Sequence, residues 1–132
     1  MLRKYFFRIA LVSWMVFVTF SSLFSFSNVS TPSFTFPHID KVVHFTFYFV
    51  AVVLGVLAIR ENFKTPITLV KAISIMIIVA IVYGIFMEVL QSVYTSDRQG
   101  DVLDGLANSL GAITGGVILK IYFSTKSALK WH

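Results

Sequence analysis

The stretch AISIMIIVAIVYGIFMEVL, residues 72–90, decides what kind of protein this chain forms. It carries one charged residue, Glu88, close to its end. A helix needs about 20 mostly apolar residues to cross the hydrocarbon layer of a membrane, which is about 30 Å thick. Three further stretches are similar in length and mostly apolar, namely residues 9–26, 42–59 and 102–122. Because the connections between these spans are short, the sequence predicts an all-α membrane protein, an antiparallel bundle of four transmembrane helices.

The composition excludes a water-soluble globule and argues against nucleic acid as a partner. Of the 132 residues, 57% are hydrophobic and 13% are charged, whereas soluble domains contain about 45–50% apolar residues. The net charge is +5, but long apolar runs separate the basic residues, so that no basic face for nucleic acid is expected. The expected partner is the lipid bilayer. Since the chain has no cysteine, a thiolate metal site is excluded as well.

We expect one domain that comprises residues 1–132, with residues 27–41 as a connector on the outer side. The first span follows three basic residues, but its apolar run exceeds the about 7–15 residues of a signal-peptide core. We therefore interpret it as a membrane anchor, and a cleaved signal peptide is the alternative. Thr65 as a cap and Pro66 at the first helical position predict that the third helix begins before its apolar run.

The basic residues are distributed unevenly over the connections between the spans. Cytoplasmic loops of membrane proteins carry an excess of Lys and Arg. Of the eleven basic residues, nine precede the first span, lie between the second and third spans, or lie at or beyond the end of the fourth. Only Lys41 and Arg98 fall on the opposite side. We therefore expect both termini to be cytoplasmic.

Polar residues form one stripe on each of three spans, near the predicted outer face. Residues three or four apart share a face of a helix. The stripes are Asp40, His44 and Tyr48; Glu88 and Gln91; and Asp101, Asp104 and Asn108. Placing an ionisable group in the centre of a membrane costs about 2.5–3.5 kcal/mol, so such groups usually line a bundle interior or a wet cavity. We predict that the three stripes face one another around a polar cavity that opens to the outer side.

These residue types suit acid and base chemistry, anion binding or a metal ion. His44 is a candidate general acid or base with Asp40 to orient it, and Lys41 and Arg98 suit a phosphate or carboxylate. The candidate catalytic residues are His44, Glu88, Asp104 and Asp40. The candidate substrate-binding residues are Lys41, Tyr48, Gln91, Arg98, Asp101 and Asn108. One histidine with carboxylates also suits a divalent cation, for which the candidate ligands are His44, Glu88, Asp101 and Asp104.

Several functions fit such a cavity, and the sequence leaves them open. An enzyme that acts on an envelope substrate is one. A non-catalytic protein that binds a cell-wall precursor, an envelope lipid or another membrane protein is a second. A buried ion-pair network that fixes the register of the helices is a third. Small residues at Gly105/Ser109 and Gly111/Gly115 predict close packing of the fourth span against a neighbour.

Two segments that contain these stripes resemble the VanZ-like family. HIDKVVHFTFYFVAVVLG, residues 38–55, is similar to its DKxxHxxxY segment, and EVLQSVYTSDRQGDVLDGLANSLGAITG, residues 88–115, is similar to its ExxQ, Arg, D-x-x-D, N-x-x-G segment. The matching positions also include Gly111. The resemblance implies a small multi-pass protein of the bacterial plasma membrane, related to proteins linked with teicoplanin resistance. The resemblance names no reaction. Taken with the polar stripes, it leads us to expect a protein whose site opens to the extracytoplasmic face and acts on or binds an envelope lipid, a cell-wall precursor or a glycopeptide.

Overall fold

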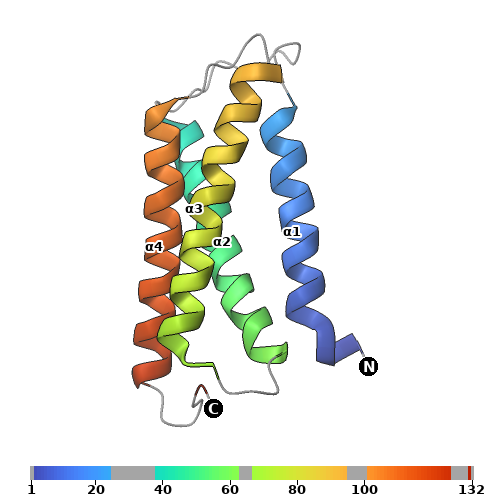
Figure 1. Cartoon of the computed structure of the whole chain (residues 1–132), viewed down its shortest axis with the longest axis vertical. Helices are drawn as coiled ribbons and strands as arrows, with labels where there is room; N and C mark the ends of the chain where they lie inside the picture. The colour runs from blue at the N-terminus through green and yellow to red at the C-terminus, as the bar shows by residue number, and fades with distance from the viewer. Residues whose placement is uncertain (1, 25–37, 63–66, 95–100, 126–130, 132) are drawn as a thin grey trace.

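The computed structural model describes residues 2–24, 38–62, 67–94, 101–125 and 131. After a short helix η1 (Leu2–Tyr5), the chain forms four α-helices (Figure 1). These are α1 (Phe6–Leu23), α2 (Ile39–Asn62), α3 (Leu69–Tyr94) and α4 (Val102–Thr125). Each is long and apolar enough to cross a membrane. The predicted fold class, four transmembrane helices without strands, is therefore confirmed over the described part of the chain.

The four helices run alternately up and down, with both chain ends at the same end of the bundle (Figure 1). Helix α2 contacts all three other helices and packs most extensively against α4. We call the end at which α1 and α3 finish and α2 and α4 begin the polar end, because the predicted stripes lie there.

The interior is built from small and medium side chains, and large apolar side chains cover the outside. Val52, Val56, Ala72 and Ala112 have no exposed surface. Valine, isoleucine, leucine and phenylalanine side chains on the outward faces of all four helices are more than half exposed, among them Val12, Phe20, Val82 and Leu110. This distribution of side chains suits a bundle whose outer surface contacts lipid tails rather than water.

Glycines let α4 approach α2 at backbone distance. A Cβ atom on Gly111 would overlap the carbonyl oxygen of Phe45, and one on Gly115 would lie 2.9 Å from that of Phe49. The predicted close packing at this pair is therefore confirmed. The prediction of close packing is wrong for Gly105, since a Cβ atom there would meet nothing within 4 Å.

Helix α1 is joined to the rest of the bundle by polar contacts along its length. Trp14 Nε1 donates to the carbonyl oxygen of Phe47 at 2.9 Å. Nearer the polar end, the Thr19 hydroxyl is hydrogen-bonded to the hydroxyl of Tyr83 on α3. The first predicted span is thus an integral part of the bundle.

The helices extend beyond the apolar runs that predicted them. Residues 27–41 were expected as a connector, but α2 begins at Ile39, so that Asp40 lies in its first turn. An acidic residue in the first turn is favoured by the helix dipole, which hydropathy does not register. Helix α3 begins at Leu69 with Thr68 Oγ1 accepting from the Lys71 backbone N–H at 3.3 Å. The predicted cap at residues 65–66 lies outside the described residues.

Candidate functional site

Lys41, in the first turn of α2, holds three aspartates at the polar end. Its Nζ atom donates to Asp40 Oδ2 at 2.9 Å, to Asp101 Oδ2 at 3.0 Å and to Asp104 Oδ1 at 2.9 Å. An ammonium group has three N–H donors, and all three are used. Lys41 therefore joins the start of α2 to the start of α4, and it has no free donor for the anionic ligand that the sequence suggested.

Asp101 serves as the cap of α4. Its Oδ1 atom accepts from the Leu103 backbone N–H at 2.9 Å, and its carbonyl oxygen accepts from the N–H groups of Asp104 and Gly105. The Leu103 N–H, together with the Lys41 ammonium, lowers the pKa of the Asp101 carboxyl below its usual 3.8. This residue is therefore ionised and fixed by the helix terminus that it caps.

His44 lies one turn below Lys41, between two carboxylates. Its Nδ1 atom is 3.0 Å from Asn108 Oδ1 and 3.8 Å from Glu88 Oε1, and its Nε2 atom is 3.6 Å from Asp104 Oδ2. Because an amide oxygen only accepts hydrogen bonds, Nδ1 donates its proton to Asn108. The Nε2 atom faces the side on which Asp104 lies. Asn108 thus orients His44, whereas Asp40, expected in that role, pairs with Lys41.

Two buried polar atoms in this group lack a hydrogen-bond partner among the described residues. They are Glu88 Oε2 and Asn108 Nδ2. The Asn108 residue is only 2% exposed, so that water does not reach its amide freely. Buried polar atoms are almost always satisfied in folded proteins, and exceptions mark strain, an ion or a ligand. The Asn108 side chain and the Asp101 backbone nevertheless lie close enough to interact with the Glu88 carboxylate, so the two atoms belong to one polar region in which hydrogen-bond geometry is incomplete.

The three predicted metal ligands that the fold brings together are His44, Glu88 and Asp104. One ligand atom of each lies within 4.8 Å of the others. Asp101, the fourth predicted ligand, is outside this group and is bound to Lys41 and Leu103.

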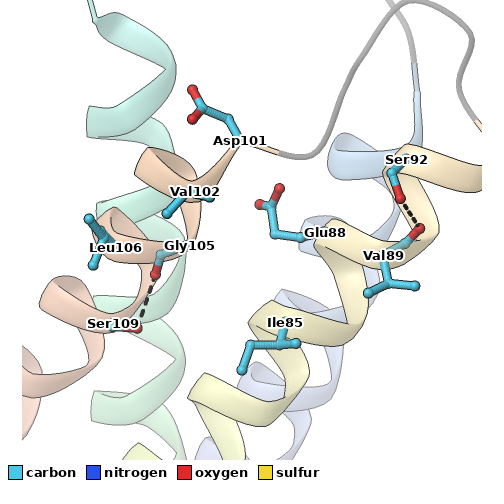
Figure 2. A pocket seen from close by; sticks show the side chains of 9 residues that line it. All are labelled: Ile85, Glu88, Val89, Ser92, Asp101, Val102, Gly105, Leu106 and Ser109. Atoms are coloured by element: carbon cyan, nitrogen blue, oxygen red, sulfur yellow. Dashed lines mark hydrogen bonds between the residues drawn. The ribbon is translucent and has the colours of Figure 1, made fainter.

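A groove between α3 and α4 leads to Glu88. It has a volume of about 480 Å³ and is lined by Ile85, Glu88, Val89, Ser92, Asp101, Val102, Gly105, Leu106 and Ser109. Figure 2 shows the Glu88 side chain pointing from α3 toward α4, where Gly105 presents no side chain. Because Ile85, Val89 and Leu106 are more than half exposed on the outer surface, the groove opens where lipid would lie.

A second hollow reaches the site from the other side, between α1 and α2. It has a volume of about 340 Å³, and its lining includes Ser21, Ser22, Asp40 and His44. His44 is therefore flanked by this hollow on one side and by Glu88, at the edge of the α3–α4 groove, on the other.

Two predicted substrate-binding residues are buried among the helices. Gln91 is 4% exposed, and its Nε2 atom donates to the Ser22 carbonyl oxygen at 2.7 Å, which ties the end of α3 to the end of α1. Tyr48 is 3% exposed and packs in the apolar core beside Tyr83. Arg98 lies outside the described residues.

Gly84 is a site residue that the sequence reasoning missed. A Cβ atom there would lie 3.2 Å from Tyr48 Cε1 and 3.3 Å from Asn108 Nδ2. Its small size therefore makes room for the amide that orients His44. Its spacing could have indicated this position, because Gly84 lies four residues before Glu88 and therefore on the same face of the helix.

Comparison with protein families gave a match over most of the chain. Residues 4–123 match the family model described as VanZ/LLP1, which confirms the predicted resemblance and includes every residue of the site. Comparisons with curated proteins and with solved structures gave no match.

Proposed function

The chain belongs to the VanZ/LLP1 family and has four helices fit to cross a membrane, and on this basis we propose that it binds a membrane lipid at its polar end. The headgroup lies beside Glu88, and an acyl or prenyl chain lies in the α3–α4 groove.

The mixed lining of this groove carries the proposal. Most of the groove wall is apolar, but Glu88 and Asp101 line the part of the groove that lies at the polar end of the bundle. A ligand that matches both the apolar wall and the carboxylates has an apolar chain and a polar head. Membrane lipids have this structure. The Glu88 Oε2 atom has no partner among the described residues, so a headgroup hydroxyl suits it as a hydrogen-bond donor.

The distribution of basic residues supports an outward-facing site. Lys and Arg gather at the end opposite the polar end, and cytoplasmic loops carry such an excess. The polar end then faces the outside of the plasma membrane with both termini in the cytoplasm. The ligands available there are envelope lipids and lipid-linked precursors of the cell wall.

Acid and base catalysis on the bound headgroup is the second candidate function. His44 favours it, because the ring lies between Glu88 and Asp104 with its Nδ1 proton fixed by Asn108. A histidine held in one tautomer is suited to take up or release a proton at Nε2. The Lys41 cluster, in contrast, fits the structural ion-pair network that the sequence left open.

Photolabelling in nanodiscs tests the lipid proposal. The protein is reconstituted with a phosphoglycerol lipid that carries a diazirine in its acyl chain, and the adducts are mapped by mass spectrometry. Adducts are expected to be several-fold enriched at Ile85, Val89 and Leu106 over the outward face of α1. Gly105→Phe fills the groove, because a side chain there meets open space, and should abolish the enrichment.

Val117→Phe is the matched control. It adds a ring on the outer face of the same helix, at a residue that is 49% exposed and outside the groove lining. Both variants are first checked for helical content and a single size-exclusion peak. Adducts spread evenly over all outward faces, or enrichment that survives Gly105→Phe, would show that the groove holds no preferred lipid.

A further inference from the structure

We infer that His44, Glu88 and Asp104 form a binding site for one divalent transition-metal ion of the Mn²⁺ or Zn²⁺ type. The site lies where the proposed lipid headgroup would be, but its existence is argued from the side chains alone.

The spacing of the three side chains fits a single ion. Their ligand atoms lie within 4.8 Å of one another, and His44 Nε2 is 3.6 Å from Asp104 Oδ2. Two atoms bound to one ion at about 2.0–2.2 Å can be at most about 4.4 Å apart. Nε2 already faces Asp104, whereas Glu88 Oε1 lies 3.8 Å from Nδ1, so coordination through Nε2 requires the Glu88 side chain to move toward Asp104.

Asn108 prepares His44 as a ligand. Metal-bound histidines usually donate their other ring N–H to a carbonyl or carboxylate, which fixes the ring and the tautomer. The contact between His44 Nδ1 and Asn108 Oδ1, at 3.0 Å, is of this type. The imidazole is also nearly enclosed, with a side-chain exposure of 10%.

The carboxylates at the polar end outnumber the cationic groups described there, which favours binding of a cation. The described residues there include four carboxylates, and Lys41 contacts only the three aspartates. Glu88 has no cationic partner within 4 Å in the described chain other than His44, and its Oε2 atom is buried without a hydrogen bond. Unpaired charge is costly in a poorly hydrated site. An ion between Glu88 and Asp104 removes that cost.

The ligand set selects the class of metal. Mg²⁺ prefers oxygen ligands and retains several waters, whereas an imidazole nitrogen with carboxylates suits Mn²⁺, Fe²⁺ or Zn²⁺. Asn108 Nδ2, buried and without an acceptor among the described residues, is a ready donor to a water or phosphate oxygen on the ion. Binding of a lipid phosphate to the ion rests on the lipid proposal. In that case the ion turns an acidic site into one that accepts a headgroup phosphate.

Calorimetric titration of metal-stripped protein in detergent tests the site without any lipid. The protein carries an affinity tag free of histidine, and Mn²⁺ and Zn²⁺ are the probes, with Mg²⁺ for comparison. We expect one ion per chain and weaker binding of Mg²⁺. Glu88→Gln and Asp104→Asn should each lower the affinity at least tenfold. Glu61→Gln, the same change at the opposite end of α2, should leave it unchanged.

Pulsed EPR of bound Mn²⁺ identifies the histidine. Coupling to an imidazole nitrogen is expected in the parent protein and should be lost in His44→Gln. It should persist when the other two histidines, His38 and His132, are replaced. If His44→Gln does not fold, the two carboxylate variants still decide the result.

Absence of stoichiometric binding, or affinity that is unchanged in Glu88→Gln and Asp104→Asn, would overturn the site. That outcome leaves the lipid proposal standing, because the groove adducts are measured separately and the nanodisc labelling is repeated with a chelator present. Conversely, metal binding in detergent with no enrichment of groove adducts would support the ion and contradict the lipid.

Discussion

Gly111 of α4 lies against the backbone of Phe45 in α2, so closely that a methyl group on the glycine would overlap the Phe45 carbonyl oxygen. This contact is next to the candidate site on both helices, one residue after His44 on α2 and three after Asn108 on α4. The approach of the two backbones therefore sets the distance over which His44 and Asn108 form their hydrogen bond.

Gly111→Ala should destabilise the bundle and loosen the His44–Asn108 contact. The expected loss is about 1–3 kcal/mol, the usual cost of forcing extra atoms into a close-packed interface. The measurement is the thermal midpoint in detergent micelles. Gly105→Ala is the control, since it adds the same methyl group to the same helix in open space and should raise stability by about 0.5–1 kcal/mol through helix propensity. Equal effects of the two variants would disprove the role of close approach.

Lys41→Met should separate the starts of α2 and α4 by leaving three aspartates without their common partner. We expect a lower thermal midpoint, but a smaller drop than for breaking a fully buried pair, because the Lys41 side chain is 22% exposed. Lowering the pH should restore part of the thermal midpoint, because protonated aspartates no longer repel one another. Lys120→Met, an exposed lysine on α4, should show neither effect.

Gln91→Leu should act on stability rather than on ligand binding. It removes the donor to the buried Ser22 carbonyl oxygen, and leaving a buried acceptor unpaired costs about 1–3 kcal/mol. Ser92→Ala, at an exposed residue whose hydroxyl donates to the Val89 carbonyl oxygen of its own helix, should change the unfolding midpoint little. Weaker metal or lipid binding by a Gln91→Leu protein of normal stability would restore the substrate-binding role predicted from the sequence.

The Asp101 carboxyl should titrate below its usual pKa of 3.8, because the Leu103 N–H and the Lys41 ammonium favour its charged form. A lowered pKa means that the stabilisation is complete above the unfolded-state pKa and is lost as pH falls through the folded-state value. The difference in melting temperature between the parent protein and Asp101→Asn should therefore be constant at neutral pH and shrink in strong acid. NMR of the Asp101 carboxyl carbon gives the midpoint directly, and a midpoint at or above 3.8 would contradict the capping geometry.

Single cysteines test the orientation, and the absence of native cysteine makes them unambiguous. Ser92, near the polar end of α3, and Ser124, near the opposite end of α4, are both exposed. In intact spheroplasts, an impermeant maleimide should label Ser92→Cys and should reach Ser124→Cys only after permeabilisation. The reverse pattern would place the polar end in the cytoplasm.

The sequence predicts the helices and the polar stripes because both depend on local spacing. Four apolar runs of spanning length can be recognised without knowing which helices they pack against. His44 and Asn108 each belong to a polar stripe, and the residues of each stripe share one face of their helix. The structure brings them together as that spacing predicts. Helical spacing makes no prediction for Arg98, which lies between two predicted spans and outside the described residues.

The individual partners could not be predicted, because they depend on how helices are offset along their axes. Gln91 shares a helix face with Glu88, yet it lies at the height of Ser22 and bonds to that carbonyl oxygen. Tyr48 continues the stripe of His44 but is one turn deeper, where its neighbours are apolar. Asp40 is one turn before His44, yet its carboxylate pairs with the adjacent Lys41 at 2.9 Å.

The opening of the α3–α4 groove toward lipid determines how its occupancy would be controlled. A ligand that enters sideways is drawn from one leaflet, so its mole fraction in that leaflet, rather than its concentration in water, sets the saturation. A water-soluble headgroup fragment would compete poorly, since it lacks the chain that fills the groove. Affinity for this protein would therefore be expressed in mole per cent, and it would change with every lipid that dilutes the ligand.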